Sequence, residues 1–197
     1  MVQEVAILFE NYLWRGNRAT KRSADNFNAF SSNNYPQLAT IGLGIQFNED
    51  ALRRPNERRP LHVAVEMDPG VIIVDLHPGL TRESLHHMLT TPGVKGIVLR
   101  TYGAGNAPTS AWFLEEIKNT VDSGIVVVNV TQCPNGGVRA RRYASGDKLA
   151  DCGVISGHDL TTEAAVTKLM YLFGLGLPPA AVAARMGVDL CGEVTDN

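Results

Sequence analysis

The stretch at residues 99–117, LRTYGAGNAPTSAWFLEEI, runs from an apolar segment into helical spacing, and two features at this crossing could do chemistry. Gly103 and Gly105 precede Asn106, whose carboxamide either caps the following helix or points from a tight turn toward a ligand. Arg100 ends an apolar run, where a guanidinium usually grips a carboxylate in a bidentate pair. That carboxylate belongs either to a structural Asp or Glu or to a bound ligand.

Several familiar catalytic and cofactor patterns are absent from the sequence. The glycines before Asn106 lack the third glycine of a dinucleotide fingerprint, because Pro108 stands at that position. The histidines have no companions at a metal-ligand spacing, and the adjacent His86 and His87 would point in different directions on a helix. The Gly-x-Ser-x-Gly elbow of serine hydrolases is missing. We therefore expect no metal site, no cofactor and no serine nucleophile.

The pattern from about residue 68 onward alternates between strands and helices. Short β-branched runs punctuated by glycine are typical of strands buried on both faces: GVIIVDLHPG, GIVLRTYG, GIVVVNVTQ and GVISG. Helical spacing between and after them predicts helices at residues 81–89, 110–121, 162–173 and 178–186. The alternation predicts an α/β domain at residues 68–197, with a small parallel sheet of about four strands flanked by helices.

The first third of the chain, residues 1–67, does not follow this alternation. The apolar strand VAILF is followed by the turn-rich ENYLWRGN, a polar stretch and a second possible strand, LATIGLGIQF. A strand as apolar as VAILF normally needs neighbours on both sides, and the sequence offers no obvious one. We interpret residues 1–67 as an incomplete piece of another α/β domain that ends in a solvated connector, RRPNERRP at residues 53–60.

Composition argues against several classes of partner. The 197 residues carry 18 Lys and Arg against 20 Asp and Glu, so no positive field attracts nucleic acid or an anionic membrane surface. The apolar runs fall far short of the roughly 20 residues that cross a bilayer, and we see no signal-peptide pattern. Three widely spaced cysteines without a CxxC pair predict reduced thiols. We expect a cytoplasmic protein that binds neither nucleic acid nor membranes.

Four stretches together resemble one enzyme family. They are FENYLWRGNRATKRSADNFNAFSSNNYPQL, VLRTYGAGNAP, GIVVVNVTQC and GVISGHDLTTEAAVTKLMYL. These stretches are similar to the C-terminal half of the cytoplasmic, type I L-asparaginases, which hydrolyse asparagine to aspartate and ammonia. The resemblance covers nearly the whole chain. It implies an asparaginase C-terminal domain at residues 68–197, and the last strand and lysine loop of the N-terminal domain at residues 1–67.

The same resemblance implies a catalytic role for Lys21 and shows that the segment with the threonine nucleophile is missing from the sequence. Family members attack the side-chain amide with a threonine from an N-terminal TGGTI segment, while a lysine beside a Thr-Asp motif relays the proton. Lys21 matches that lysine, although without the family it would be taken for a surface lysine. Neither TGGTI nor a Thr-Asp motif in the right context occurs in the sequence. We therefore expect this chain alone to be inactive, as a fragment or as one half of a split enzyme.

Four further residues acquire roles through the resemblance. In related asparaginases an asparagine of this C-terminal loop reaches into the active site of a neighbouring subunit, so Asn106 would bind substrate in trans in a homo-oligomer. Its two flanking glycines would let the backbone approach the partner chain closely. Cytoplasmic members also carry a site for effector asparagine, and the matching residues here are Thr20, Arg100 and Cys133. Arg100 would grip the effector carboxylate.

Two other interpretations of the sequence remain open. One is a non-catalytic domain for asparagine binding or assembly, which keeps the effector and subunit surfaces. The other is a generic flavodoxin-like ligand binder. Asparagine binding that depends on Arg100, without hydrolysis, would distinguish the first of these from a split enzyme.

Overall fold

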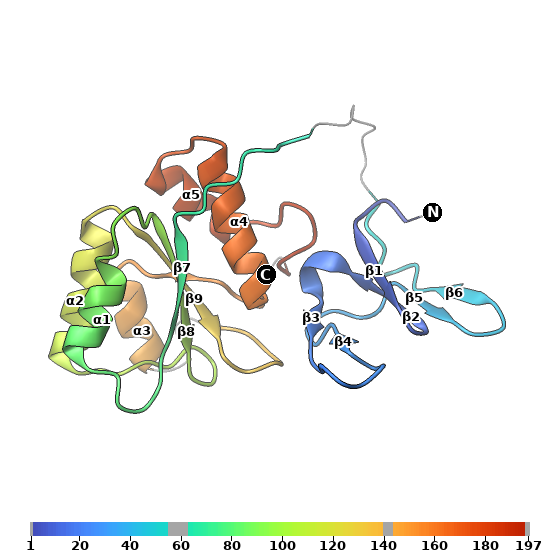
Figure 1. The fold of residues 1–197 in the computed structure, drawn as a ribbon, viewed down its shortest axis with the longest axis horizontal. Helices are drawn as coiled ribbons and strands as arrows, with labels where there is room; N and C mark the ends of the chain where they lie inside the picture. The colour runs from blue at the N-terminus through green and yellow to red at the C-terminus, as the bar shows by residue number, and fades with distance from the viewer. Residues whose placement is uncertain (1, 55–62, 140–143, 196–197) are drawn as a thin grey trace.

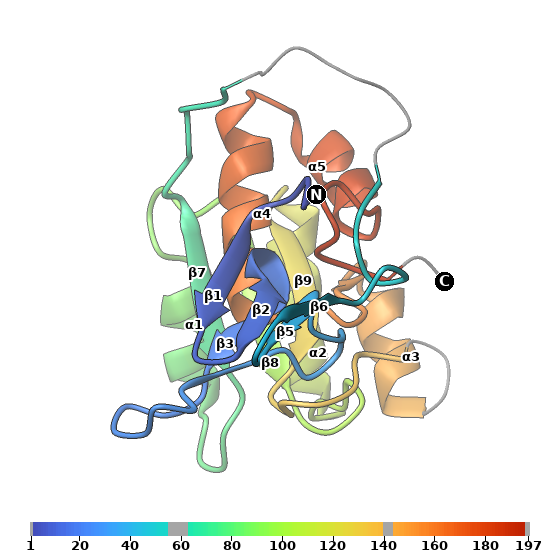
Figure 2. The ribbon, with the colours of Figure 1, turned by 90° about the vertical axis from the view of Figure 1, so that its right-hand side faces the viewer.

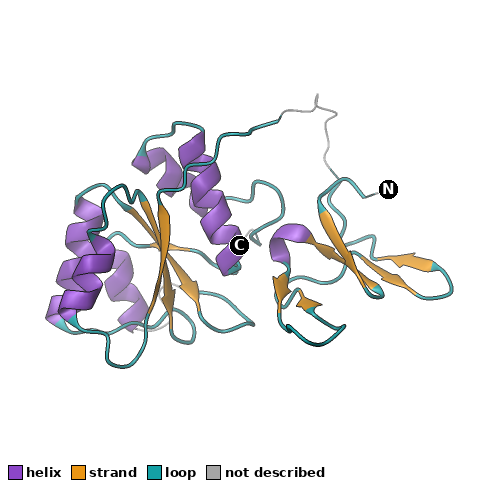
Figure 3. Ribbon diagram, viewed as in Figure 1, coloured by secondary structure: helices purple, strands orange, loops and turns teal. Residues whose placement is uncertain are grey.

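The computed structural model describes residues 2–54, 63–139 and 144–195. The chain forms two parts, which Figure 1 shows side by side. The N-terminal part, residues 2–54, is built from β-hairpins, and the C-terminal part, residues 68–195, is built from a parallel sheet and helices (Figure 3). Most of the predicted connector lies outside the described residues, which include only its first two arginines.

The sheet of the C-terminal part is parallel and four-stranded, with the order β10-β9-β8-β7. Its strands are β7 Val71–Asp75, β8 Gly96–Thr101, β9 Val126–Thr131 and β10 Ile155–Ser156. Every residue of β8 except Arg100 is buried, as is every residue of β9 except Thr131. Strands covered on both faces have this burial, which confirms the predicted α/β fold class.

Helices cover both faces of the parallel sheet (Figure 1). One face carries α1 Arg82–Leu89, α2 Ala111–Asp122 and α3 Ala144–Asp151, and the other carries α4 Thr162–Gly174 and α5 Pro179–Met186. Successive strand residues supply the two cores, because their side chains alternate between faces. Ile97 and Leu99 pack with the helices of the first face, and Val98 packs with those of the second.

The helix boundaries follow ordinary capping chemistry. Thr81 begins α1 by accepting a hydrogen bond from the backbone N–H of Ser84 at 3.2 Å. Thr161 begins α4 in the same way, with the N–H of Ala164 at 3.1 Å. Each of the four predicted helices is confirmed to within one residue at both ends. Helix α3 was not predicted, because its eight residues, ASGDKLAD, carry little apolar periodicity.

The N-terminal part is an antiparallel sheet with the order β1-β2-β5-β6. Its strands are β1 Ala6–Phe9, β2 Tyr12–Arg15, β5 Ala39–Ile41 and β6 Ile45–Phe47. Two predictions were wrong here. The stretch read as turn-rich contains β2, since the chain turns already at Glu10, where φ is 51°. The stretch read as one strand, LATIGLGIQF, is a hairpin, because its two glycines lie in the turn between β5 and β6.

A short segment connects the two hairpins and carries the predicted lysine. The 3-10 helix Gly16–Arg18 is followed by β3 Thr20–Lys21, which pairs antiparallel with β4 Phe30–Ser31. Figure 2, which looks onto the N-terminal part, shows these strands in front of the C-terminal part. Among the described residues, β1 pairs only with β2, so the other edge of β1 is open.

No helix in the described portions of the chain is both long and apolar enough to cross a bilayer.

Candidate functional site

A cavity of about 630 Å³ is lined by residues of both parts of the molecule. Thr20, Asn33 and Asn34 contribute from the N-terminal part. The C-terminal part contributes side chains from β7 and β8, from the turn after β9, and from the first turns of α4. The ends of β8 and β9 are carboxyl ends of parallel strands, where ligands of open α/β sheets usually collect. This cavity is therefore our candidate binding site.

Three sequence-predicted residues line this cavity together: Thr20, Arg100 and Cys133. They come from β3, from β8 and from the turn after β9, so only the folded arrangement of the two parts brings them together. Gln132 fixes the turn that carries Cys133, since its amide donates to the carbonyl oxygens of Leu76 at 2.7 Å and Arg100 at 3.0 Å. The thiol-bearing residue Cys133 is exposed.

Arg100 has a structural carboxylate partner. Asp75 lies directly opposite it on β7, and the Nη1 of Arg100 lies 2.8 Å from the Oδ1 of Asp75. The Arg100 side chain is 30% exposed, and its Nε has no hydrogen-bond partner among the described residues. Arg100 thus holds a protein carboxylate while it also lines the cavity. Of the two alternatives for its partner, the structural one is present, and the ligand one is compatible with it.

The cavity carries charges of both signs. Glu163 lies in the first turn of α4 and accepts a hydrogen bond from the hydroxyl of Thr20 at 3.2 Å. Arg100 presents positive charge on the wall formed by the sheet. A guanidinium and a carboxylate on the walls of one cavity suit a small zwitterion, because the cation binds a carboxylate and the anion binds an ammonium group.

Lys21 is exposed and does not line this cavity. Because side chains alternate along a strand, Lys21 points away from the face on which Thr20 lies. Its ammonium nitrogen lies 5.9 Å from the ring centroid of Phe30, its cross-strand neighbour. The backbone of this short strand therefore joins a cavity-lining residue directly to the predicted catalytic lysine.

Asn106 closes a tight loop rather than capping a helix. Its backbone N–H donates to the carbonyl of Tyr102 at 2.7 Å, and its own carbonyl accepts from the N–H of Tyr102 at 3.0 Å. Of the two alternatives for Asn106, helix capping is excluded, because α2 begins only at Ala111, after Ser110. The chain needs the intervening residues to leave this loop before it can adopt helical geometry.

The glycines of this loop have left-handed backbone conformations, with φ of 50° at Gly103 and 110° at Gly105. A Cβ on Gly105 would lie 2.8 Å from a methyl carbon of Val138 in the same chain. Close packing within the chain is therefore sufficient reason for a glycine at this position.

A buried polar pair that was not predicted, Thr101 and Asn129, supports the loop that contains Asn106. Asn129 lies in the middle of β9 at 4% exposure and donates its amide to the carbonyl of Gly105 at 3.3 Å. Its amide oxygen accepts from the hydroxyl of Thr101 at 2.7 Å. The one available signal was an asparagine within the apolar run VVVNVT, since a buried amide must find hydrogen-bond partners.

Comparison with known proteins places this geometry in a family. The family model "Asparaginase, N-terminal" matches residues 1–53, and "Glutaminase/Asparaginase C-terminal domain" matches residues 70–186. The second match alone covers more than half of the chain. The chain belongs to the asparaginase family.

Individual relatives of this asparaginase-family chain include two proteins named as L-asparaginases and one named as a lysophospholipase. L-asparaginase 1 of Escherichia coli K12 is 41% identical over 196 residues, which are 100% of this chain and 57% of that protein. A crystal structure of L-asparaginase I from Vibrio cholerae matches with a TM-score of 0.92 and 39% identity, over 98% of this chain and 58% of that one. A human 60 kDa lysophospholipase is 40% identical over 198 residues, which are 99% of this chain and 34% of that protein. The chain thus spans less than three fifths of each of these relatives.

Proposed function

We propose that this chain serves in the hydrolysis of L-asparagine to L-aspartate and ammonia. The observation that carries the proposal is the match to both asparaginase family models along one chain, at 41% identity to an L-asparaginase. Residues 1–67 are the lysine-bearing piece of the N-terminal domain, and residues 68–197 are the C-terminal domain. As in the type I enzymes that the sequence resembles, the reaction takes place in the cytoplasm.

Lys21 supplies the proton-relay amine, and the threonine nucleophile comes from polypeptide outside these 197 residues. The exposure of Lys21 in this chain supports that division. A relay amine accepts a proton only from a hydroxyl within hydrogen-bond reach, and the nucleophilic hydroxyl lies on that outside polypeptide. Burial beside the reacting groups lowers the pKa of a lysine amine. The chain alone therefore releases no ammonia.

The completing polypeptide covers the apolar surface of the N-terminal sheet. Three apolar side chains of that sheet are well exposed: Leu8 at 63%, Ile45 at 61% and Phe47 at 44%. Val5, at 86% exposure, adds to this surface just before the open edge of β1. Exposed apolar side chains grouped on one sheet are typical of surfaces that another chain segment covers.

Asn106 contacts substrate in the active site of a neighbouring subunit, so the active form is a homo-oligomer. The tight, well-supported loop that carries Asn106 supports this role, because a contact made across subunits needs a rigid base. The partners of the chain are thus asparagine, further copies of itself and the completing polypeptide.

The cavity between the two parts binds asparagine as an effector, through Thr20, Arg100 and Cys133. Its charges of both signs support this assignment, with Arg100 on the carboxylate of the amino acid and Glu163 on its ammonium group. A non-catalytic asparagine-binding domain is the second candidate function. The observation that favours it is that both parts needed to line the cavity are present in this chain.

The catalytic proposal is tested by completing the enzyme. The purified chain is mixed with the N-terminal portion of a related L-asparaginase that carries the TGGTI segment, and ammonia release from asparagine is followed. We expect activity in the mixture, its loss in Lys21→Ala and its retention in Lys118→Ala, a matched exposed lysine on α2. Equal activity in the two variants would contradict the role of Lys21.

The effector proposal is tested by calorimetry on the chain alone. We expect asparagine to bind the wild-type chain and Lys118→Ala, and to bind Arg100→Ala at least tenfold more weakly. Unchanged binding in Arg100→Ala would contradict the assignment. Binding without any ammonia release in the completed mixture would favour the non-catalytic domain.

A further inference from the structure

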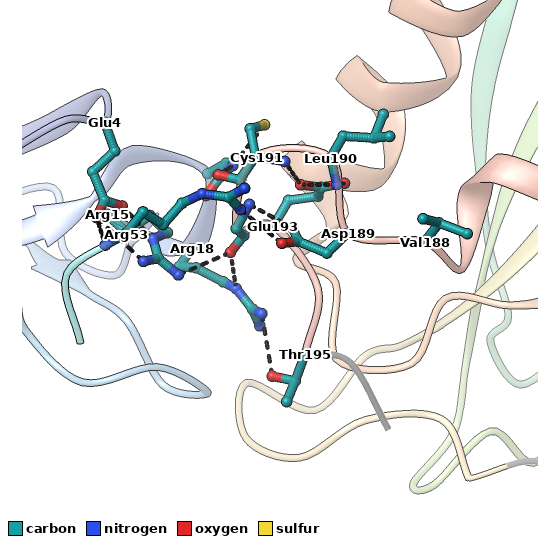
Figure 4. A network of polar contacts seen from close by, with 12 residues as sticks. Glu4, Arg15, Arg18, Arg53, Val188, Asp189, Leu190, Cys191, Glu193 and Thr195 are labelled. Atoms are coloured by element: carbon teal, nitrogen blue, oxygen red, sulfur yellow. Dashed lines mark hydrogen bonds and ion pairs between the residues drawn. The ribbon is translucent and has the colours of Figure 1, made fainter. Parts of the chain in front are cut away.

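The stretch after the last helix, residues 188–195, is buried in part although it forms no helix or strand. We call it the C-terminal segment. Gly192, Glu193 and Val194 within it are buried. Irregular segments usually run over the surface, so this burial indicates that specific contacts hold the segment. Figure 4 shows arginines of the N-terminal part reaching toward it.

A buried ion pair anchors the segment to the rest of the C-terminal part. Lys168 of α4 and Glu193 are 3% and 4% exposed, with the ammonium 2.6 Å from a carboxylate oxygen. The ammonium also donates to the carbonyl of Met186 at the end of α5 and to that of Val188. The carboxylate accepts the backbone N–H of Cys191 at 2.7 Å. Such a pair contributes little net stability, because desolvation offsets the attraction, but its many bonds fix one conformation of the segment.

The same segment holds the N-terminal part through the carbonyl oxygen of Gly192. This oxygen accepts from the Nε of Arg18 at 2.6 Å and from the Nη1 of Arg15 at 3.3 Å. Gly192 has φ of +89°, and a Cβ there would lie 2.8 Å from the Arg15 guanidinium. Only glycine meets both demands without strain. Asn17 adds a bond from its amide to the carbonyl of Cys191 at 3.0 Å.

Arg18 makes several polar contacts across the two parts. At 2% exposure it bonds Asp159 of the C-terminal part through Nη1 at 2.8 Å and the hydroxyl of Thr195 through Nη2 at 3.2 Å. Asp159 in turn accepts the backbone N–H of Thr195 at 2.9 Å. A planar guanidinium that satisfies three different acceptors in this way has one permitted orientation.

The residues held in this way lead directly into strand β3, Thr20–Lys21, which we call the lysine strand. Arg15 to Arg18 end β2 and form the 3-10 helix, and Thr20–Lys21 begins two residues after Arg18. That strand has only two residues and pairs only with Phe30–Ser31 among the described residues. So short a ladder does not set the place of Lys21 by itself.

We infer that the C-terminal segment positions the Thr20–Lys21 strand, with Arg18 and Gly192 as its positioning residues. The inference rests on the proposed catalytic role of Lys21. Through the segment, the end of the C-terminal part controls where the relay amine lies relative to the substrate. It also sets the place of Thr20 in the cavity wall. No contact between the C-terminal segment and substrate is needed for this effect.

Hydrogen exchange followed by mass spectrometry tests the positioning in the chain as it exists. We expect backbone amides of residues 16–22 to exchange at least tenfold faster in Arg18→Met and Gly192→Ala, with strands β8 and β9 unchanged. Arg18→Lys keeps the positive charge but loses the planar guanidinium, so residues 16–22 should exchange at an intermediate rate. Arg82→Met, on the far helix α1, should leave their exchange rate at the wild-type value.

If the stronger variants fail to fold, Thr195→Val replaces them, and exchange at residues 16–22 should then be about threefold faster than in wild type. Wild-type rates at residues 16–22, or equal acceleration in β8, would overturn the inference.

Kinetics of the completed enzyme separate positioning from general destabilisation. We expect Arg18→Met to lower kcat at least tenfold with KM within twofold of wild type, and Arg18→Lys to restore part of kcat. Unchanged kcat in a variant whose residues 16–22 exchange faster would overturn the positioning role. If the wild-type mixture itself is inactive, the proposed function fails, while the exchange experiment still decides whether the segment holds the strand.

Discussion

The two parts of the molecule bury their apolar side chains to very different extents. In the C-terminal part, helices on both faces of the sheet leave Leu85, Leu99 and Phe113 with no exposed surface. In the N-terminal part, the buried apolar cluster consists of three residues, Leu38, Ala51 and Leu52. Several larger apolar side chains of its sheet stay exposed instead. The C-terminal part is stabilised by its own core, whereas the N-terminal part depends on polar contacts with its neighbour.

Those polar contacts have a different physical character from a core. Ion pairs between the parts, such as Arg18 with Asp159 and Arg53 with Asp189, fix one arrangement, but the desolvation of their charges offsets most of their attraction. Apolar burial contributes about 25 cal/mol per Å² without demanding one orientation. The lysine strand is therefore placed specifically but held weakly. Such an arrangement suits a strand that the proposed completing polypeptide covers when the active site is assembled.

Breaking the buried ion pair should give the largest loss of stability. Lys168→Met leaves the Glu193 carboxylate buried without its partner, which costs about 3–5 kcal/mol in the free energy of unfolding. Urea denaturation measures this change, and the exposed pair variant Lys118→Met should lose no more than about 0.5 kcal/mol. The double variant Lys168→Met/Glu193→Leu should recover most of the loss. If Lys168→Met alone is neutral, the ion pair does not anchor the segment.

Matched leucine truncations test the difference in burial directly. Leu85→Ala, at 0% exposure, should cost about 2–5 kcal/mol, whereas Leu8→Ala, at 63%, should change the free energy of unfolding by less than about 0.5 kcal/mol. In the presence of the completing polypeptide, Leu8→Ala should become destabilising, since the side chain is then covered. Similar costs for the two truncations in the isolated chain would remove the contrast between the parts.

Acid should loosen the C-terminal segment, and with it the contacts to the N-terminal part, before it affects the apolar core. Burial alone would raise the pKa of Glu193, but the bonds from Lys168 and from backbone N–H groups outweigh it and lower the pKa to about 2. The pKa of Asp159 is lowered too, since bonds from Thr195 and Arg18 outweigh its burial. A carboxyl whose pKa is lower in the folded state stabilises the protein above its unfolded pKa, and this stability is lost as pH falls.

Urea unfolding at successive pH values measures that dependence. For Glu193 we expect a loss on the order of 2–3 kcal/mol between about pH 5 and pH 2, from the usual conversion of pKa into free energy. Glu193→Gln should flatten the pH dependence over this range, and Glu49→Gln, at an exposed ion pair of the N-terminal part, should not. An equally steep loss in Glu193→Gln would show that other groups cause it.

The same contrast explains how much the sequence could predict. Strands β8 and β9 were predictable because continuous β-branched runs usually form strands buried on both faces. The similar run of β7 also forms a strand, although at the sheet edge Ile73 is 46% exposed. The antiparallel hairpins were not, because short half-exposed strands lack a clear period and their turns depend on single residues such as Glu10. The family resemblance singled out Thr20, Arg100 and Cys133, although nothing in their sequence spacing indicates that they meet.

The C-terminal segment and its contacts were outside the reach of pattern analysis. Lys168 occupies the buried face of α4, where the apolar pattern alone would predict a hydrophobic residue. Its partner Glu193 follows 25 residues later in a stretch without periodicity. Arg18 is one of 18 basic residues, and only the folded structure shows that it is buried. Pairings between distant polar residues carry no local signal, because tertiary contacts alone create them.

The dependence of catalysis on further polypeptide is measured by ammonia release from asparagine, first with the purified chain alone and then after addition of a TGGTI-bearing N-terminal asparaginase portion. We expect no release above background from the chain alone and clear release from the mixture. Robust release from the chain alone, abolished by Lys21→Ala, would show instead that these 197 residues contain a complete active site.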